Sequence, residues 1–237
     1  MHETGSTHVT SAAPGTAVCE LTDVTRSFRG REVVRGLSLR VEAGEMVALT
    51  GRSGCGKSTV LNMIGLLDRP TSGDLRLFDR SAPRPGSRGA RRLLAERIGY
   101  LFQSFALLDE ETAEGNLRVA QAWTGGTRRS RAEMREEALA TVGLADHARD
   151  RVYELSGGEQ QRLALARLAL RPRALVLADE PTGSLDPANR ARVLDLLDGM
   201  RRRGTAVVIV THDPEVAAAC SRVVSLERGH RATTGGA

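Results

Sequence analysis

Short apolar runs alternate along the chain with segments that have a helical spacing of apolar residues. Runs rich in Val, Ile, Leu and Ala occupy 45–50, 174–178 and 205–210, and their length and β-branched content are typical of buried strands. Behind the first run, residues 58–67 carry apolar side chains at helical spacing. Strands that alternate with helices predict an α/β fold.

Composition excludes several classes of protein. The chain has 237 residues, of which 41% are hydrophobic and 27% charged, close to ordinary globular usage and unlike disordered, collagen-like or disulfide-rich chains. No apolar run approaches the roughly 18–20 residues needed to span a bilayer, and residues 1–18 do not resemble a secretory signal. The three cysteines have no metal-ligand spacing and are expected to be reduced thiols. We therefore expect a soluble, cytosolic chain.

The basic charge does not by itself indicate a nucleic-acid partner. The formal net charge is +5, and the basic residues comprise one lysine, Lys57, and 34 − 1 = 33 arginines. The arginines are scattered among 29 acidic residues and form no long basic block. Nucleic acid is therefore not the expected partner.

The lysine lies in a glycine-rich segment with the G-x-x-x-x-G-K-[ST] spacing of a phosphate-binding loop. Its residues are Gly51, Arg52, Ser53, Gly54, Cys55, Gly56, Lys57 and Ser58. Backbone N–H groups of such a loop surround phosphates, Lys57 is expected to reach the terminal phosphates, and Ser58 is expected to bind Mg²⁺. The alternative is a glycine-rich turn with no ligand. Because Cys55 lies inside the loop, we expect it to react with thiol reagents unless ATP covers it.

An acidic pair ends the second apolar run. Asp179 and Glu180 follow residues 174–178, where a carboxylate at a strand end can hold magnesium. Glu180 is then expected to accept a proton from the attacking water. Without the loop at Lys57, a solvated strand end would be the simpler interpretation.

A third motif, Ser156-Gly157-Gly158-Glu159, has the spacing of a helix-capping box. Glycines are poor helix formers, so two of them in a first turn suggest that an anion approaches the backbone closely. An ordinary capped helix is the alternative interpretation.

Together, and in this order, these motifs and the later His212 resemble an ATP-binding cassette (ABC) ATPase over residues 18–230. The resemblance implies a P-loop NTPase fold of class α/β, with an N-terminal antiparallel β layer and a helical subdomain. It also implies ATP and Mg²⁺ as ligands.

The resemblance further implies individual roles. Glu180 and His212 are the catalytic residues, with His212 contacting the γ-phosphate. The ATP-binding set is Phe28, Gly51, Arg52, Ser53, Gly54, Cys55, Gly56, Lys57, Ser58, Thr59, Gln103, Ser156, Gly157, Gly158, Glu159 and Asp186. The Mg²⁺ set is Ser58, Gln103 and Asp179. Phe28 corresponds to an aromatic that stacks on adenine, although a single aromatic near a strand is more often part of the core. A lone histidine is likewise usually structural, so the role of His212 depends on the resemblance.

One cassette domain is expected over 18–230, between a disordered tail at 1–17 and a flexible tail at 231–237. Residues 103–158 are predicted to form a helical subdomain inserted into the core. Its clearest helix is predicted to begin at the capping box Ser130-x-x-Glu133. An arginine-rich helix is predicted near 91–96.

Residues 177–186 and 65–73 resemble cassettes of the macrolide-export and lipoprotein-release type, and 100–112 most resemble those of lactococcin-type bacteriocin exporters. The resemblance implies an ATP-dependent head-to-tail dimer, in which each LSGGE motif caps the ATP of the other chain. It also implies export or extraction of a substrate through a separate membrane permease, which docks near Gln103 to Asn116. A core loop is the alternative interpretation of that segment. The cassette would lie on the cytoplasmic face of the plasma membrane.

Two other functions stay open. A cell-division type of cassette regulates a membrane protein without transport, and the motifs alone do not distinguish it from an exporter. A soluble nucleic-acid-associated ATPase is disfavoured, because the stretch between Lys57 and Ser156 is too short for the long coiled coil of repair-type cassettes.

Overall fold

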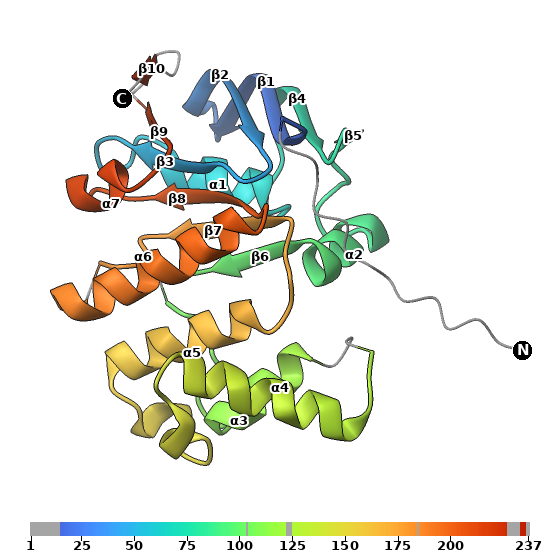
Figure 1. Cartoon of the computed structure of the whole chain (residues 1–237). Coiled ribbons are helices and arrows are strands. Elements are labelled where there is room, and N and C mark those ends of the chain that lie inside the picture. Colours follow the sequence, from blue (N-terminus) through green and yellow to red (C-terminus); the bar gives the residue numbers. More distant parts are fainter. Residues whose placement is uncertain (1–14, 103, 122–124, 184, 227–232, 236–237) are drawn as a thin grey trace, which may run out of the picture.

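The computed structural model describes residues 15–102, 104–121, 125–183, 185–226 and 233–235. Figure 1 shows two sheets stacked above a group of helices, with further helices along the sides of the larger sheet. The smaller sheet is antiparallel and has the strand order β2-β1-β4-β5. Its strands are β1 (Ala17–Phe28), β2 (Arg31–Glu42), β4 (Ser72–Leu77) and β5 (Arg80–Ser81).

The larger sheet has the order β10-β9-β3-β8-β7-β6, in which β9, β3, β8, β7 and β6 are mutually parallel. Its strands are β3 (Met46–Thr50), β6 (Ile98–Leu101), β7 (Leu175–Asp179), β8 (Ala206–Val210), β9 (Arg222–Ser225) and β10 (Thr233–Gly235). Parallel strands need crossover connections, which the helices supply.

The central strands are apolar on both sides because each sheet face packs against its own core. Side chains alternate along a strand, so Val208 of β8 faces one core and Val207 faces the other. The first core lies between the two sheets and includes α1. The second contains apolar residues of α3, α4, α5 and α6.

The α-helices are α1 (Lys57–Ile64), α2 (Arg88–Glu96), α3 (Ala113–Ala120), α4 (Arg128–Thr141), α5 (Gly157–Ala169), α6 (Pro187–Arg202) and α7 (Pro214–Ala218). Two single 3₁₀ turns, η1 (Ala145–His147) and η2 (Val152–Glu154), precede α5. In the part of the chain that the structure describes, no helix is both long and apolar enough to cross a bilayer.

Three sequence predictions are corrected. Helix α4 begins at Arg128 and not at the Ser130 box, because Thr127 is its N-cap and accepts the N–H of Ser130. The expected partner Glu133 instead pairs with Arg129 at 2.8 Å.

Residues Thr233–Gly235 form β10 antiparallel to β9, where a flexible tail was expected. The edge of β9 presents backbone N–H and C=O groups, and these can pair with a segment of any sequence. The side-chain pattern of 233–235 therefore did not reveal this strand. Strand β1 also includes Ala17, one residue inside the expected N-terminal tail.

Candidate functional site

The candidate site lies at the carboxyl ends of three adjacent strands. The glycine loop follows β3, Asp179 and Glu180 stand at the end of β7, and His212 follows β8. The strand order β3-β8-β7 brings these three segments to one edge of the parallel sheet. This edge is where α/β sheets bind ligands. The fold therefore assembles residues that are up to 161 positions apart (212 − 51) in the sequence.

Two glycines make the loop possible. Gly51 and Gly56 have φ angles of 139° and 104°, in a region that other residues rarely adopt. A Cβ atom on Gly51 would collide with the carbonyl oxygen of Leu226, and one on Gly56 would lie 2.8 Å from the carbonyl oxygen of Val33. The loop thus passes directly against neighbouring backbone, which keeps it compact at the start of α1.

The loop leaves cationic and N–H groups available for phosphate. The Nζ atom of Lys57 donates to the carbonyl oxygens of Gly51 and Arg52, at 2.8 and 3.2 Å, so the ammonium group is held across the loop. Among the described α-helices, α1 is the one whose N-cap, Gly56, provides no side-chain hydrogen bond. The N–H groups of its first turn and the helix dipole therefore favour an anion.

Ser58 and Asp179 form the candidate magnesium position. The Oγ atom of Ser58 lies 3.4 Å from Oδ1 of Asp179 and donates to it. Partial burial raises the pKa of Asp179, and the charge of Glu180 acts in the same direction, whereas Ser58 and Lys57 oppose both. A half-buried carboxylate beside a second one favours a nearby cation, and hydroxyl and carboxylate oxygens are ligands that Mg²⁺ accepts. The residues present therefore fit Mg²⁺.

Glu180 and His212 are in direct contact. The Oε1 atom of Glu180 is 2.9 Å from Nδ1 of His212, and this hydrogen bond raises the pKa of His212. Glu180 has a φ of 48°, a left-handed conformation that costs a non-glycine residue about 1–3 kcal/mol. Its N–H donates to the carbonyl of Val210 at 2.9 Å, so the strand edge holds the turn in place.

Other predicted loop residues differ in accessibility. Arg52, Ser53 and Gly54 are exposed, and Thr59 is half-buried. Cys55 is 4% exposed and belongs to the core between the sheets, so the expectation of an accessible thiol is wrong. The positive φ angles of Gly54 and Gly56 turn this residue inward, although the three residues before it are exposed.

Phe28 lies at the end of β1 and is 45% exposed, so it is not a core residue. The guanidinium carbon of Arg26 lies 4.3 Å from the centroid of its ring, and Arg26 is itself paired with Asp68 at 2.8 Å. An exposed ring with a cation over one face has the other face available for stacking.

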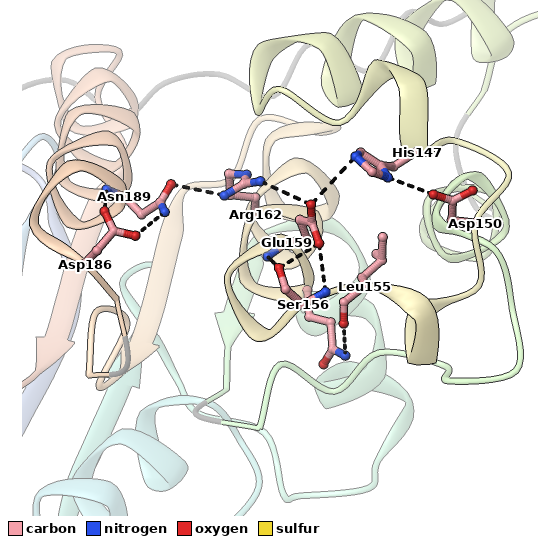
Figure 2. A network of polar contacts seen from close by, with 9 residues as sticks. His147, Asp150, Leu155, Ser156, Glu159, Arg162, Asp186 and Asn189 are labelled. Carbon is pink, nitrogen blue, oxygen red and sulfur yellow. Dashed lines mark hydrogen bonds and ion pairs between the residues drawn. The ribbon is translucent and has the colours of Figure 1, made fainter.

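The first turn of α5 is closed by the predicted capping box (Figure 2). Glu159 accepts from the N–H of Ser156 at 2.8 Å and from its hydroxyl at 2.6 Å, and these bonds lower the pKa of Glu159. His147 extends the contact, with Nε2 at 3.7 Å from Glu159 and Nδ1 at 2.7 Å from Asp150. Figure 2 shows His147 between these two carboxylates.

A second branch of the same network reaches α6. Arg162 lies 4.0 Å from Glu159 and donates to Oδ1 of Asn189 at 3.1 Å. The side chain of Asn189 bonds to Asp186, the N-cap of α6, which also accepts the N–H of Asn189 at 3.0 Å (Figure 2). The hydrogen bonds from Asn189 lower the pKa of Asp186. The capped start of α5 is thus joined by side chains to the start of α6.

The predicted ATP-binding residues form two groups within the chain. The loop before α1, together with Asp179, Glu180 and His212, forms one group. The Ser156–Glu159 turn begins α5, which packs on the opposite face of the parallel sheet from α1. Gln103 lies outside the described residues.

Sequence reasoning did not identify His147, Arg162, Asn189 or Arg167. The guanidinium group of Arg167 donates to two carbonyl oxygens, of Phe105 and Ala106, more than 60 positions away. An i,i+3 spacing relates Glu159 to Arg162 and was available as a signal. The contacts of Arg167 and Asn189 depend on tertiary structure and left no such signal.

Comparisons with known proteins agree with this geometry. The family model described as ABC transporter matches residues 34–183. The macrolide export ATP-binding/permease protein MacB of Escherichia coli K12 is 40% identical over 218 residues, which cover 90% of this chain and 34% of MacB. The chain thus spans about a third of the length of this curated relative.

Among solved structures, the dimeric bacterial ABC transporter cassette MJ0796 is 32% identical with a TM-score of 0.82, covering 91% of this chain and 98% of that one. Its post-hydrolysis dimer with ADP and Pi matches at 31% identity with the same TM-score and coverage. The motifs, the geometry and all three comparisons agree, and the chain belongs to the ABC transporter family as one of its ATP-binding cassettes.

Proposed function

We propose that the chain binds ATP with Mg²⁺ at the edge formed by β3, β8 and β7, hydrolyses it, and powers a membrane permease. The observation that supports this most is the meeting of the Lys57 loop, the Ser58–Asp179 contact and the Glu180–His212 pair at one sheet edge. An anion site, a cation site and a proton acceptor are the three requirements of metal-assisted ATP hydrolysis.

Each residue has a distinct part in this proposal. The loop N–H groups and Lys57 bind the phosphates, and Phe28 stacks on the adenine. Ser58 and Asp179 would hold Mg²⁺, which neutralises phosphate charge when it is bound. Glu180 accepts the proton of the water that attacks the γ-phosphorus, and the bond to the bridging oxygen breaks to release ADP. His212 contacts the γ-phosphate and, through its bond to Glu180, orients the carboxylate.

The Ser156–Glu159 turn serves the ATP of a second copy. A Cβ atom on Gly157 would meet no atom within 4 Å from the described residues outside its own helix turn, so their packing does not require that glycine. A glycine in a helix costs about 0.5–1 kcal/mol relative to alanine, which suggests that a ligand from outside approaches the turn. The position of α5 on the far face from α1, and the dimeric MJ0796 cassette, support a head-to-tail dimer.

The permease docks on the segment near Gln103 to Asn116. Leu108 in this segment is 48% exposed, and the nearby Tyr153 of η2 is 56% exposed, so apolar surface is available for a partner. Docking would place the chain on the cytoplasmic face of the membrane. By its likeness to MacB, an export ATP-binding/permease protein, we propose that the coupled process is export or extraction of a substrate.

The partner is tested by purifying tagged Glu180→Gln protein from native membranes with and without ATP, followed by mass spectrometry. The proposal expects a membrane permease that co-purifies, and a dimer that is more abundant with ATP. A membrane protein with no transport activity would support the cell-division type of function. Recovery of ribosomes or nucleic acid without a membrane protein would contradict the coupling and leave the ATPase chemistry intact.

A further inference from the structure

The segment after β6 contains a turn with an uncommon backbone. Phe105 and Ala106 have φ angles of 60° and 48°, so two successive non-glycine residues adopt left-handed conformations. Such conformations bring Cβ close to the carbonyl oxygen and are rarely found side by side in L-residues. Their amides bond within the turn, with Phe105 donating to the carbonyl of Phe102 at 2.9 Å and Ala106 to that of Ser104 at 2.7 Å.

Arg167 of α5 holds this turn from the side. Its Nη2 atom donates to the carbonyl oxygen of Phe105 at 2.6 Å, and its Nη1 atom donates to that of Ala106 at 2.5 Å. Burial lowers the pKa of Arg167. The two carbonyl oxygens accept hydrogen bonds from the partly buried guanidinium group and so offset the cost of burying it. The planar guanidinium donates to the two carbonyls from two different nitrogen atoms held in one plane, whereas a lysine would have only its single Nζ atom for both.

The second half of the segment has a separate support. The buried side chain of Asn116, in α3, accepts the N–H of Leu108 at 2.8 Å and donates to the carbonyl of Leu108 at 3.1 Å. The turn at Phe105 and Ala106 is therefore held by α5, and the following residues are held by α3. These two supports can be tested independently, because Asn116 accepts the amide of Leu108 directly, whereas Arg167 holds the carbonyl groups of a turn whose own amides are those of Phe105 and Ala106.

We propose that Arg167 is a positioning residue, which holds the Phe105–Ala106 turn in its left-handed conformation and so ties α5 to the segment that leaves β6. The same helix carries the Ser156–Glu159 turn at its other end. A shift of α5 must therefore move the turn with it. This inference rests on the proposed function, because it treats the segment after β6 as part of the working cassette.

The first test is amide hydrogen exchange, resolved by NMR, in wild-type and Arg167→Gln full-length protein. We expect the Phe105 and Ala106 amides to exchange at least about tenfold faster in the variant, because losing the charge-assisted hydrogen bonds to the turn's carbonyl groups lets the turn open and frees its amides from Phe102 and Ser104. The Leu108 amide, which Asn116 holds, should keep its wild-type rate. Arg171→Gln is the matched control, because Arg171 makes its hydrogen bond to Ala95, at 3.2 Å, and not to the turn.

The second test is rescue. Glycine adopts left-handed conformations freely, so Ala106→Gly in the Arg167→Gln background should restore part of the lost ATPase rate. We expect Arg167→Gln to lower kcat about tenfold, within the roughly 100-fold that misplacement by 1 Å can cost, while KM for ATP keeps its value because the Lys57 loop is untouched. Arg171→Gln should keep both constants.

Unchanged exchange at Phe105 and Ala106, or a rate that Ala106→Gly does not raise, would overturn the inference. If Arg167→Gln does not fold, Arg167→Lys provides the same comparison, since it keeps the charge but loses the planar fork. A wild-type protein without ATPase activity would contradict the proposed function instead, and the exchange measurement would still decide whether Arg167 holds the turn.

Discussion

The Nδ1 atom of His212 lies 2.9 Å from Oε1 of Glu180, although the two side chains differ greatly in exposure. The imidazole is 73% exposed, whereas the carboxylate is 16% exposed. The Glu180 carboxylate, the proposed base, is thus sheltered at the end of β7, and the His212 imidazole reaches it from the solvent side. This arrangement limits the access of bulk water to the carboxylate, and the imidazole remains free to contact a ligand.

The contact predicts a titration that NMR can follow. In the nucleotide-free protein, the pKa of His212 should lie above its ordinary value near 6.5, because Glu180 accepts its hydrogen bond. Glu180→Gln should bring that pKa down toward 6.5. The pKa of His147, which the bond to Asp150 also raises, should not change in this variant and is the internal control.

The same pair predicts the sign of a pH effect on stability. Because the folded pKa of His212 is raised, its contribution is fully present below the unfolded pKa near 6.5 and is lost as pH rises through the folded pKa. The difference in free energy of unfolding between wild type and Glu180→Gln should therefore shrink as pH rises. A difference that grows toward alkaline pH would contradict the pairing.

Lys57→Ala should weaken nucleotide binding. Hydrogen bonds to charged groups contribute about 1.5–3 kcal/mol, so we expect Kd for ATP to rise about 10-fold to 100-fold. Calorimetry measures this directly. Arg129→Ala removes one cation at an exposed site of α4 and should leave Kd unchanged. Equal losses in both variants would indicate a general charge effect and contradict the role of the loop.

Gly157→Ala tests whether Gly157 is needed for dimer formation and not for folding of the single chain. Beyond its chain neighbours and its own helix, no described residue has an atom within 4 Å of the added Cβ, and alanine is the better helix former, so the free energy of unfolding should stay equal or rise by up to about 1 kcal/mol. ATP-dependent dimer formation and ATPase rate should both fall, since the methyl group would face the second copy in the proposed dimer. Full activity in this variant would argue against close approach at Gly157.

Thiol labelling tests the burial of Cys55. Cys55 and Cys19 are buried, whereas Cys220 is half-buried and burial raises its pKa to about 11. In the native protein we expect slow labelling at all three thiols, with Cys220 first, and rapid labelling after unfolding. ATP should slow Cys55 further by opposing local opening of the loop. Labelling of native, ATP-free Cys55 at the unfolded rate would contradict its placement.

The sequence was sufficient to predict an element wherever the local hydrophobic pattern and the local side-chain chemistry indicate the same structure. The strand before the phosphate loop, the helix after it and the capping box at Ser156 each follow from nearby residues, and the structure confirms all three elements. Capping chemistry alone could not choose between Thr127 and Ser130, because both residues can cap a helix and the residues between them are compatible with one.

The long-range contacts could not be predicted from the sequence, for a physical reason. The pairing of Thr233–Gly235 with β9 is made by backbone groups, and the hydrogen bond from Arg167 to the carbonyl of Ala106 joins residues 61 positions apart. Neither contact has a periodicity or spacing in the sequence. The inward turn of Cys55 likewise depends on φ angles of the loop glycines, which composition does not reveal.

The most direct test of the account is Glu180→Gln, assayed for ATP hydrolysis and for dimer formation by light scattering with Mg²⁺ and ATP. Loss of a general base should lower kcat about 100-fold to 10,000-fold. ATP binding should persist, because the Lys57 loop is intact, and the protein should accumulate as an ATP-bound dimer. Full ATPase activity in Glu180→Gln, or loss of nucleotide binding together with activity, would contradict the assignment of Glu180 as the base.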